Sequence, residues 1–313
     1  MKTLYYSHPD FLKHDTGPGH PESADRLKAI DLALTDRKFT DLIAVKPEIA
    51  NDIEEKLKLI HSPAMIAELL AKFPAKGLIY LDPDTAASPG SKTAALLAVS
   101  AVCDAVDKVL SGSADNAFCA VRPPGHHAEP GRSMGFCLFN NIAIGAEYAR
   151  KQYSLERIAI VDFDVHHGNG TQAAFYKQPQ VFYASSHQWP FYPGSGAATE
   201  TGCGNILNLP LAAGTSGAEF RSKYLETLLP AVKAFKPQLL LISAGFDAHR
   251  NDPLASLRLD ESDFHWVTRQ LSAIAGERCG GRIVSVLEGG YDLDALGRSV
   301  AAHVAGLMGL DFI

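Results

Sequence analysis

The chain has 313 residues, of which 46% are hydrophobic and 20% are charged, and this balance excludes an intrinsically disordered protein. Its formal net charge of −6, without any run of basic residues, argues against direct binding of nucleic acid, which requires a positive surface. The longest apolar run, residues 94–103, is far too short to span a membrane. The composition therefore predicts a globular protein, with residues 1–313 forming one large domain.

The cysteines and the first residues both indicate a cytoplasmic protein. Five cysteines form an odd, widely spaced set without a C-x-x-C pair: Cys103, Cys119, Cys137, Cys203 and Cys279. Such a set predicts neither a disulfide framework nor a thiolate metal site. Residues 1–14 contain no continuous apolar segment of the secretory type, so we expect no leader and no membrane association.

Short β-type runs alternate with amphipathic helical segments along the whole chain. Strands are predicted at residues 3–6, 116–121, 158–161, 181–184, 238–242 and 282–287. Helices are predicted from near residue 21 or 22, from residue 88 or 91 to 110, and at 140–150, 172–176, 216–235, 260–277 and 292–307. Without an internal repeat or a linker, this alternation predicts an α/β fold, an open and mostly parallel sheet with helices on both faces.

The predicted strand at residues 116–121 leads into RPPGHHAE. Two prolines make this entry rigid, and His126 and His127 follow it. Because imidazole titrates near neutrality, adjacent histidines suit proton transfer or ligation. The alternative is one buried structural histidine beside one on the surface.

The most informative segment is residues 157–171, RIAIVDFDVHHGNGT. Its apolar first half predicts a strand buried on both faces, and polar residues begin where that strand ends. Asp164 and His166 are two residues apart, so on extended backbone both side chains can reach one metal ion. Asp162 is either a third ligand or a residue that orients one. The alternative is a turn in which these side chains bond only to backbone or face solvent.

Two later strand ends carry similar chemistry. Asp247 follows the strand at residues 238–242, and Tyr291 follows the Gly-Gly pair after the strand at 282–287. Since ligands bind at the carboxyl ends of strands in open α/β sheets, these residues are expected to meet Asp164 and His166. Two carboxylates and one imidazole suit Zn²⁺ with an open position for water, and Fe²⁺ or Co²⁺ suit the same set. Hydrolysis of an amide or ester is the expected reaction, with Tyr291 donating to the oxyanion.

The order and content of these segments closely resemble the histone deacetylase superfamily, which includes acetylpolyamine amidohydrolases and acetoin-utilisation proteins. The shared motifs are HPE followed by Arg26, RPPGHHAE, GFC-FNN, D-DVHHGNGTQ, PGSG, SAGFDAH-DP and LEGGY. The resemblance implies an arginase-like α/β fold around an eight-stranded parallel sheet. It also implies a zinc site at Asp164, His166 and Asp247.

The resemblance assigns roles to the remaining polar residues. His127 resembles the general base and acid, and His126 the histidine that stabilises the transition state, oriented by Asp162. Asn169 stands where class I members have an aspartate, as in class II, and implies a less elevated pKa for His127. Tyr291 resembles the catalytic tyrosine, and its presence implies an active enzyme.

The family's acyl-lysine tunnel and K⁺ site also have counterparts here. By resemblance the substrate is bound by Asp84, Pro124, Gly135, Phe136, Tyr192, Leu254 and Gly289. Asp84 would be the rim aspartate that holds the substrate backbone, with Asp82 as the alternative. K⁺ would bind near the backbone of Asp162, Asp164 and His166 and the side chain of Ser185.

The expected function is zinc-dependent removal of acetyl or other acyl groups from N-acyl amines, foremost ε-acetyl-lysine in proteins or peptides. An acetylpolyamine is the alternative substrate, although the polyamine-selective vertebrate relative has a glutamate where this chain has Leu254. Two further alternatives are a non-catalytic acyl-lysine binder and a two-metal ureohydrolase. The latter needs D-x-H-x-D spacing, whereas Gly168 stands two residues after His166. The oligomeric state stays open, and a homodimer or a larger assembly is compatible with the sequence.

Overall fold

The structure is a computed structural model that describes residues 1–312. A fully parallel sheet of eight strands has the order β2-β1-β5-β10-β9-β6-β7-β8. The strands are β1 (Thr3–Tyr6), β2 (Ile43–Val45), β5 (Asn116–Cys119), β6 (Ile158–Asp162), β7 (Val181–Gln188), β8 (Ile206–Leu211), β9 (Leu239–Ala244) and β10 (Ile283–Leu287). A separate antiparallel pair consists of β3 (Ile79–Tyr80) and β4 (Ala86–Ala87). The predicted α/β class with a parallel sheet is confirmed.

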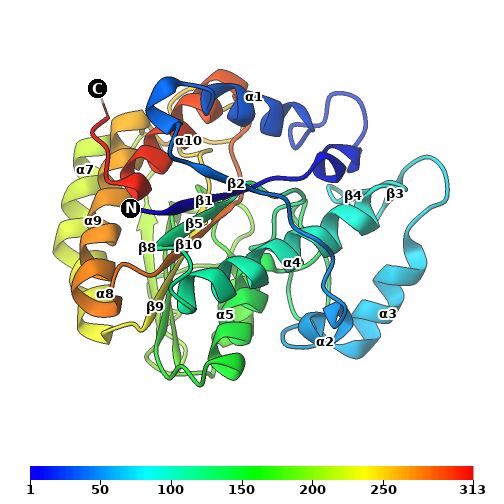
Figure 1. The fold of residues 1–313 in the computed structure, drawn as a ribbon, viewed down its shortest axis with the longest axis horizontal. Coiled ribbons are helices and arrows are strands. Elements are labelled where there is room, and N and C mark those ends of the chain that lie inside the picture. Colours follow the sequence, from blue (N-terminus) through cyan, green and yellow to red (C-terminus); the bar gives the residue numbers. More distant parts are fainter. Residues whose placement is uncertain (313) are drawn as a thin grey trace.

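Helices cover both faces of the sheet (Figure 1). The α-helices are α1 (Asp25–Ala33), α2 (Ile53–Leu57), α3 (Pro63–Lys72), α4 (Ser91–Leu110), α5 (Asn141–Gln152), α6 (Asn169–Phe175), α7 (Gly217–Lys223), α8 (Leu229–Phe235), α9 (Glu261–Cys279) and α10 (Leu293–Met308). Short 3-10 turns lie at Pro9–Lys13 and Arg37–Phe39. Helices α4 and α5 pack on one face of the central strands, and α8, α9 and α10 pack on the other.

The central strands form because their apolar residues can be buried on both faces of the sheet. All residues of β6, β9 and β10 are buried, and their apolar residues belong to one continuous hydrophobic core. Helix ends follow local capping chemistry. Asp260 and Asp263 form a capping box at the start of α9, and Gly280, with a φ of 63°, ends that helix.

Several predicted boundaries were wrong. The predicted strand at 181–184 continues to Gln188, and the helix predicted at 216–235 is interrupted by a π-helical turn, Tyr224–Leu228. The edge strands β2 and β8 and the helices α2 and α3 were not predicted. Within residues 1–312, no helix combines the length and apolar character that crossing a membrane requires.

The strand order gathers the polar loops at one edge of the sheet. Strands β5, β10, β9, β6 and β7 are consecutive neighbours, and all of them run in the same direction. The ends of β5, β10, β9 and β6 are nearly level, because Asp162 of β6 pairs with Ser243 of β9, Leu287 of β10 with Ala244, and Val286 of β10 with Cys119. The loops that leave these four strands therefore begin side by side.

Candidate active site

Three side chains from the loops after β6 and β9 form a compact group that can hold a metal ion. Asp164, His166 and Asp247 are buried, and one ligand atom from each lies within 4.8 Å of the others. Nδ1 of His166 is 3.2 Å from Oδ1 of Asp164 and 3.2 Å from Oδ2 of Asp247. Asp247 thus meets the other two side chains from the loop after a separate strand.

The charge of this group fits a divalent cation. Burial opposes a charge on His166, yet the hydrogen bonds to Asp164 and Asp247 outweigh burial and raise the pKa of His166 to about 10. The two carboxylates thus stabilise a positive charge between them. A bound cation would supply this charge in place of the second proton on His166. Backbone donors orient both acids, since Gly289 N–H donates to Oδ2 of Asp164 and Val165 N–H donates to Oδ1 of Asp247.

Gly289 must be glycine for the loop after β10 to reach this group. A Cβ atom at Gly289 would overlap the Asp247 carboxylate and lie 2.7 Å from Oδ2 of Asp164. Only a residue without a side chain lets the backbone approach so closely. Gly289 therefore contacts the acidic side chains and is not among the residues that line the cavity, where the family resemblance placed it.

His126 is held by Asp162, which orients it and lies outside the metal group. Nδ1 of His126 is 3.0 Å from Oδ2 of Asp162, and that oxygen also accepts a hydrogen bond from the Tyr183 hydroxyl at 3.0 Å. Burial lowers the pKa of His126, but the charges of Asp162, Asp164 and Glu288 overcome it and raise that pKa to about 10. His126 is therefore cationic at neutral pH.

His127 differs from its neighbour in both partner and charge. Its Nδ1 lies 2.8 Å from Oδ1 of Asn169, which is the first residue of α6. Burial, together with the positive charges of His126 and His166, holds the pKa of His127 well below its ordinary value. One histidine of the pair is thus a cation and the other is a neutral imidazole.

Glu288, which the sequence analysis did not single out, holds the histidine loop. Its Oε2 accepts the backbone N–H groups of Gly125 at 2.7 Å and His126 at 3.1 Å. The carboxyl is fully buried, and burial raises the pKa of Glu288 to about 7. No local pattern marks such a residue, because its partners are more than 160 positions away in the chain.

Tyr291 stays protonated and is held by two distant residues. Burial and the negative charge of Asp247 raise its pKa well above the ordinary value, so the hydroxyl remains a hydrogen-bond donor. Its backbone N–H donates to Oδ2 of Asp252 at 2.7 Å. Arg26 of α1 donates from Nε to the carbonyl of Gly290 at 2.7 Å and from Nη2 to the carbonyl of Glu288. Arg26 belongs to a shared motif, but its contacts could not be inferred from the sequence.

A cavity of about 210 Å³ opens beside the metal group and His127. It is lined by Asp84, His127, Gly135, Phe136, His166, Phe191, Tyr192, Leu254 and Tyr291. Five predicted substrate residues are in this set, whereas Pro124 is buried and, like Gly289, is not among them. Phe191 also lines the cavity, and its ring stacks on that of His166 with centroids 5.5 Å apart.

Asp82 and Asp84 occupy different places in the turn after β3. Asp82 accepts the backbone N–H groups of Asp84 and Thr85 and so caps the turn, while Asp84 lines the cavity. Burial and the nearby Asp82 raise the pKa of Asp84. The Thr85 hydroxyl connects this turn to the cavity wall by accepting the Phe136 N–H at 3.1 Å.

Comparison with known proteins identifies similar chains over almost the whole length. The family model described as "Histone deacetylase domain" matches residues 20–307. A probable deacetylase of Archaeoglobus fulgidus is 38% identical over 99% of this chain and 88% of its own length. The polyamine deacetylase HDAC10 of Mus musculus is 40% identical over 82% of this chain and 40% of its own length. The crystal structure of the HDA15 HD domain superposes with a TM-score of 0.92 at 33% identity, covering 99% of this chain and 88% of that one.

Proposed function

This chain belongs to the histone deacetylase family and is a deacetylase, a hydrolase that acts on amide bonds, and we propose that it is a zinc-dependent deacylase of ε-acyl-lysine. The observation that carries the proposal is the buried group of Asp164, His166 and Asp247 beside a cavity that also contains Tyr291 and His127. Two carboxylates and one imidazole would hold Zn²⁺, with Fe²⁺ or Co²⁺ as alternatives.

The ion supplies Lewis-acid chemistry when it is bound, since it polarises the amide carbonyl and acidifies a water molecule. His127 lines the cavity as a neutral imidazole, so it can take the proton of the attacking water and later pass it to the leaving amine. His126 is a cation at neutral pH and would favour the negative charge that develops on the carbonyl oxygen. Tyr291 would donate a hydrogen bond to that same oxygen.

The cavity suits an acylated aliphatic chain. Phe136 and Tyr192 provide apolar walls. Asp84, in the turn between β3 and β4, also lines the cavity. Apolar walls with a few oriented polar groups are typical of a small-molecule pocket. We propose that the four methylene groups of an acetyl-lysine side chain occupy this passage while Asp84 accepts the substrate's backbone N–H.

An acetylpolyamine is the second candidate, favoured by the similarity to the mouse polyamine deacetylase. Leu254 weighs against it, because an apolar residue at the cavity offers no charge to a second ammonium group. Lysine is therefore the preferred substrate of this proposal. A comparison of kcat/KM for an acetyl-lysine peptide and for N-acetylputrescine would reverse this order if the polyamine were the better substrate.

Further parts of the proposal concern the surroundings of the site. A K⁺ ion near the backbone of Asp162, Asp164 and His166 with Ser185 is supported by the register that pairs Asp162 with Ser185. A single catalytic domain is supported by one sheet whose strands come from residues 3 to 287. A cytoplasmic location is supported by five cysteines that are all free in the structure.

Release of free amine separates this proposal from a non-catalytic acyl-lysine binder. Purified protein supplied with Zn²⁺ is incubated with a fluorogenic ε-acetyl-lysine amide. The proposal predicts that acetate and free amine are released in equal amounts over many turnovers. A protein that binds the amide tightly but releases neither product would be a binder, and the catalytic assignment would be withdrawn.

A further inference from the structure

The orientation of one side-chain amide decides whether His127 can act as a base. Asn169 can present either its oxygen or its NH₂ group to Nδ1 of His127. If the oxygen faces the ring, Nδ1 carries the proton and Nε2 is free to accept another. If the NH₂ group faces the ring, Nδ1 must be unprotonated, and Nε2 then carries the proton of the neutral imidazole and cannot act as a base.

The end of the Asn169 amide that does not face His127 faces Glu129. Nδ2 of Asn169 lies 2.8 Å from Oε1 of Glu129, and its other neighbours are the His127 carbonyl at 3.4 Å and Sδ of Met134 at 3.3 Å. All three are acceptors, and the carboxylate is the nearest and the strongest. An ionised carboxylate has no proton to donate, so only the NH₂ group of Asn169 can face it.

We propose that Glu129 is a positioning residue for the deacylation reaction, which fixes the amide of Asn169 and thereby the Nδ1-protonated tautomer of His127. The three side chains form a chain of hydrogen bonds from the surface to the cavity. The inference rests on the proposed role of His127 as the base, and it adds a residue that belongs neither to the metal group nor to the cavity lining.

The backbone of Glu129 is itself held in place. Residues 129–132 form a tight turn, in which Glu129 N–H donates to the carbonyl of Arg132 at 2.9 Å. The Glu129 carbonyl lies 3.0 Å from Nδ1 of His61, whose Nε2 accepts the N–H of Asn140 at 2.9 Å. Burial lowers the pKa of His61 to about 4, so this histidine remains a neutral connector at working pH.

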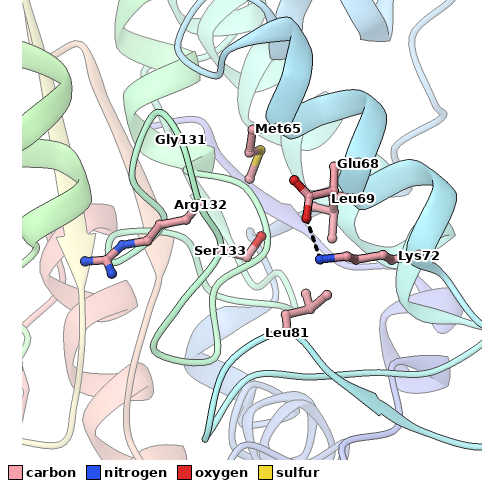
Figure 2. Close-up of a pocket in the computed structure, with 8 residues that line it drawn as sticks. All are labelled: Met65, Glu68, Leu69, Lys72, Leu81, Gly131, Arg132 and Ser133. Atoms are coloured by element: carbon pink, nitrogen blue, oxygen red, sulfur yellow. Dashed lines mark hydrogen bonds and ion pairs between the residues drawn. The ribbon is translucent and has the colours of Figure 1, made fainter.

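Arg132 fixes the Glu129 carboxylate from the outside. Its Nε lies 2.9 Å from Oε2 and its Nη2 lies 3.2 Å from Oε1, a bidentate pair. Figure 2 shows that the Arg132 side chain points away from the neighbouring pocket, in which Glu68 pairs with Lys72. Arg132 is therefore committed to Glu129, and Glu68 is an acid of the same region without a contact to Asn169.

The test compares a carboxylate at position 129, which can only accept hydrogen bonds, with an amide, which can also donate them. Glu129→Gln keeps the shape but offers both a carbonyl and an NH₂ group, so Asn169 is no longer forced into one orientation. We expect kcat to fall about tenfold with KM nearly unchanged, because the loss affects the fraction of competent base rather than substrate binding. Glu68→Gln is the matched control and should keep the kcat of the unmodified protein.

A second substitution gives a result that a merely structural role would not produce. Asn169→Asp restores an acceptor-only partner for His127 whatever stands at position 129. In the Glu129→Gln background it should therefore raise kcat, whereas in the unmodified background it places two carboxylates together and should lower kcat. Equal effects of Asn169→Asp in both backgrounds would overturn the proposal.

A spectroscopic measurement tests the inference without requiring activity. ¹⁵N NMR of histidine-labelled protein, assigned by comparison with His127→Asn, reports which ring nitrogen of His127 carries the proton. We expect Nδ1 in the unmodified protein and a mixture or the opposite tautomer in Glu129→Gln. A proton on Nε2 in the unmodified protein, or the same tautomer in both proteins, contradicts the role of Glu129. An inactive protein with the expected tautomers would instead contradict the proposed function alone.

Discussion

The guanidinium of Arg26 lies over the ring of Tyr291, with its Cζ atom 5.1 Å from the ring centroid. The same guanidinium binds the carbonyls of Gly290 and Glu288, so a residue of α1 determines where the backbone of this distant loop lies. Since Arg26 is fully buried and its planar fork matches both acceptors, a single ammonium cannot replace it.

Arg26→Lys should therefore lower kcat by roughly 10- to 100-fold, because it misplaces the Tyr291 hydroxyl while retaining the buried charge. KM should change much less, since the cavity walls remain. Lys28→Gln, on the exposed side of the same helix, is the control and should be neutral. A kcat equal to that of the unmodified protein would mean that the loop is held without Arg26.

Tyr291→Phe removes the hydroxyl without altering the ring. If the hydroxyl stabilises the oxyanion, kcat should fall about 10²–10³-fold while the protein keeps its metal content and melting temperature. Steady-state kinetics together with metal analysis measure both. An unchanged kcat would remove Tyr291 from the mechanism.

Leu254→Glu should change substrate preference. A carboxylate at the cavity attracts the second ammonium of an acetylpolyamine, and a partly exposed ion pair contributes up to about 1 kcal/mol, or roughly fivefold in relative kcat/KM. The measurement is the ratio of kcat/KM for N-acetylputrescine to that for an acetyl-lysine peptide. Leu254→Gln is the control for size and polarity, and the same ratio in both variants would show that charge at this position does not select the substrate.

His303 predicts a pH dependence of stability away from the site. It is fully buried between Thr268 and Ser285, and burial lowers its pKa to about 3. The unfolded chain therefore binds a proton below about pH 6.5 that the folded chain does not, so stability from this group is present above pH 6.5 and is lost as the pH falls.

His303→Gln should be less stable at pH 7 because it disturbs these two hydrogen bonds. Its disadvantage should shrink by about 2 kcal/mol between pH 7 and pH 5, since the variant lacks the titrating group. Urea unfolding of both proteins at the two pH values measures this difference. A constant difference would show that His303 is not neutral in the folded protein.

Much of the fold could be predicted because the central strands are locally distinctive. Residues 158–161 are apolar and buried on both faces, and such runs are recognisable without tertiary information. The edge strands β2 and β8 could not be recognised in the same way, since β2 is largely exposed and β8 contains Asn208 and Pro210. Their strand conformation depends on pairing with β1 and β7.

The candidate site likewise has parts that are recognisable from the local sequence and parts that depend on distant contacts. Asp164 and His166 could be paired from their spacing alone, and the strand-end argument brought Asp247 to them. The supporting contacts could not be inferred, because Arg26 and Gly290 are 264 positions apart and Glu288 and Gly125 are 163 positions apart. The contact of Glu129 with Asn169 likewise arises only when the turn after β5 meets the start of α6.

Metal dependence at Asp247 is the central claim, and one titration tests it most directly. Protein stripped with a chelator is titrated with Zn²⁺ while bound metal and hydrolysis of an acetyl-lysine amide are both followed, with Asp247→Asn alongside. We predict that hydrolysis is absent without metal and saturates at one ion per chain, and that Asp247→Asn neither retains the ion nor recovers activity. Full activity in the stripped protein, or two ions required per chain, would contradict the account.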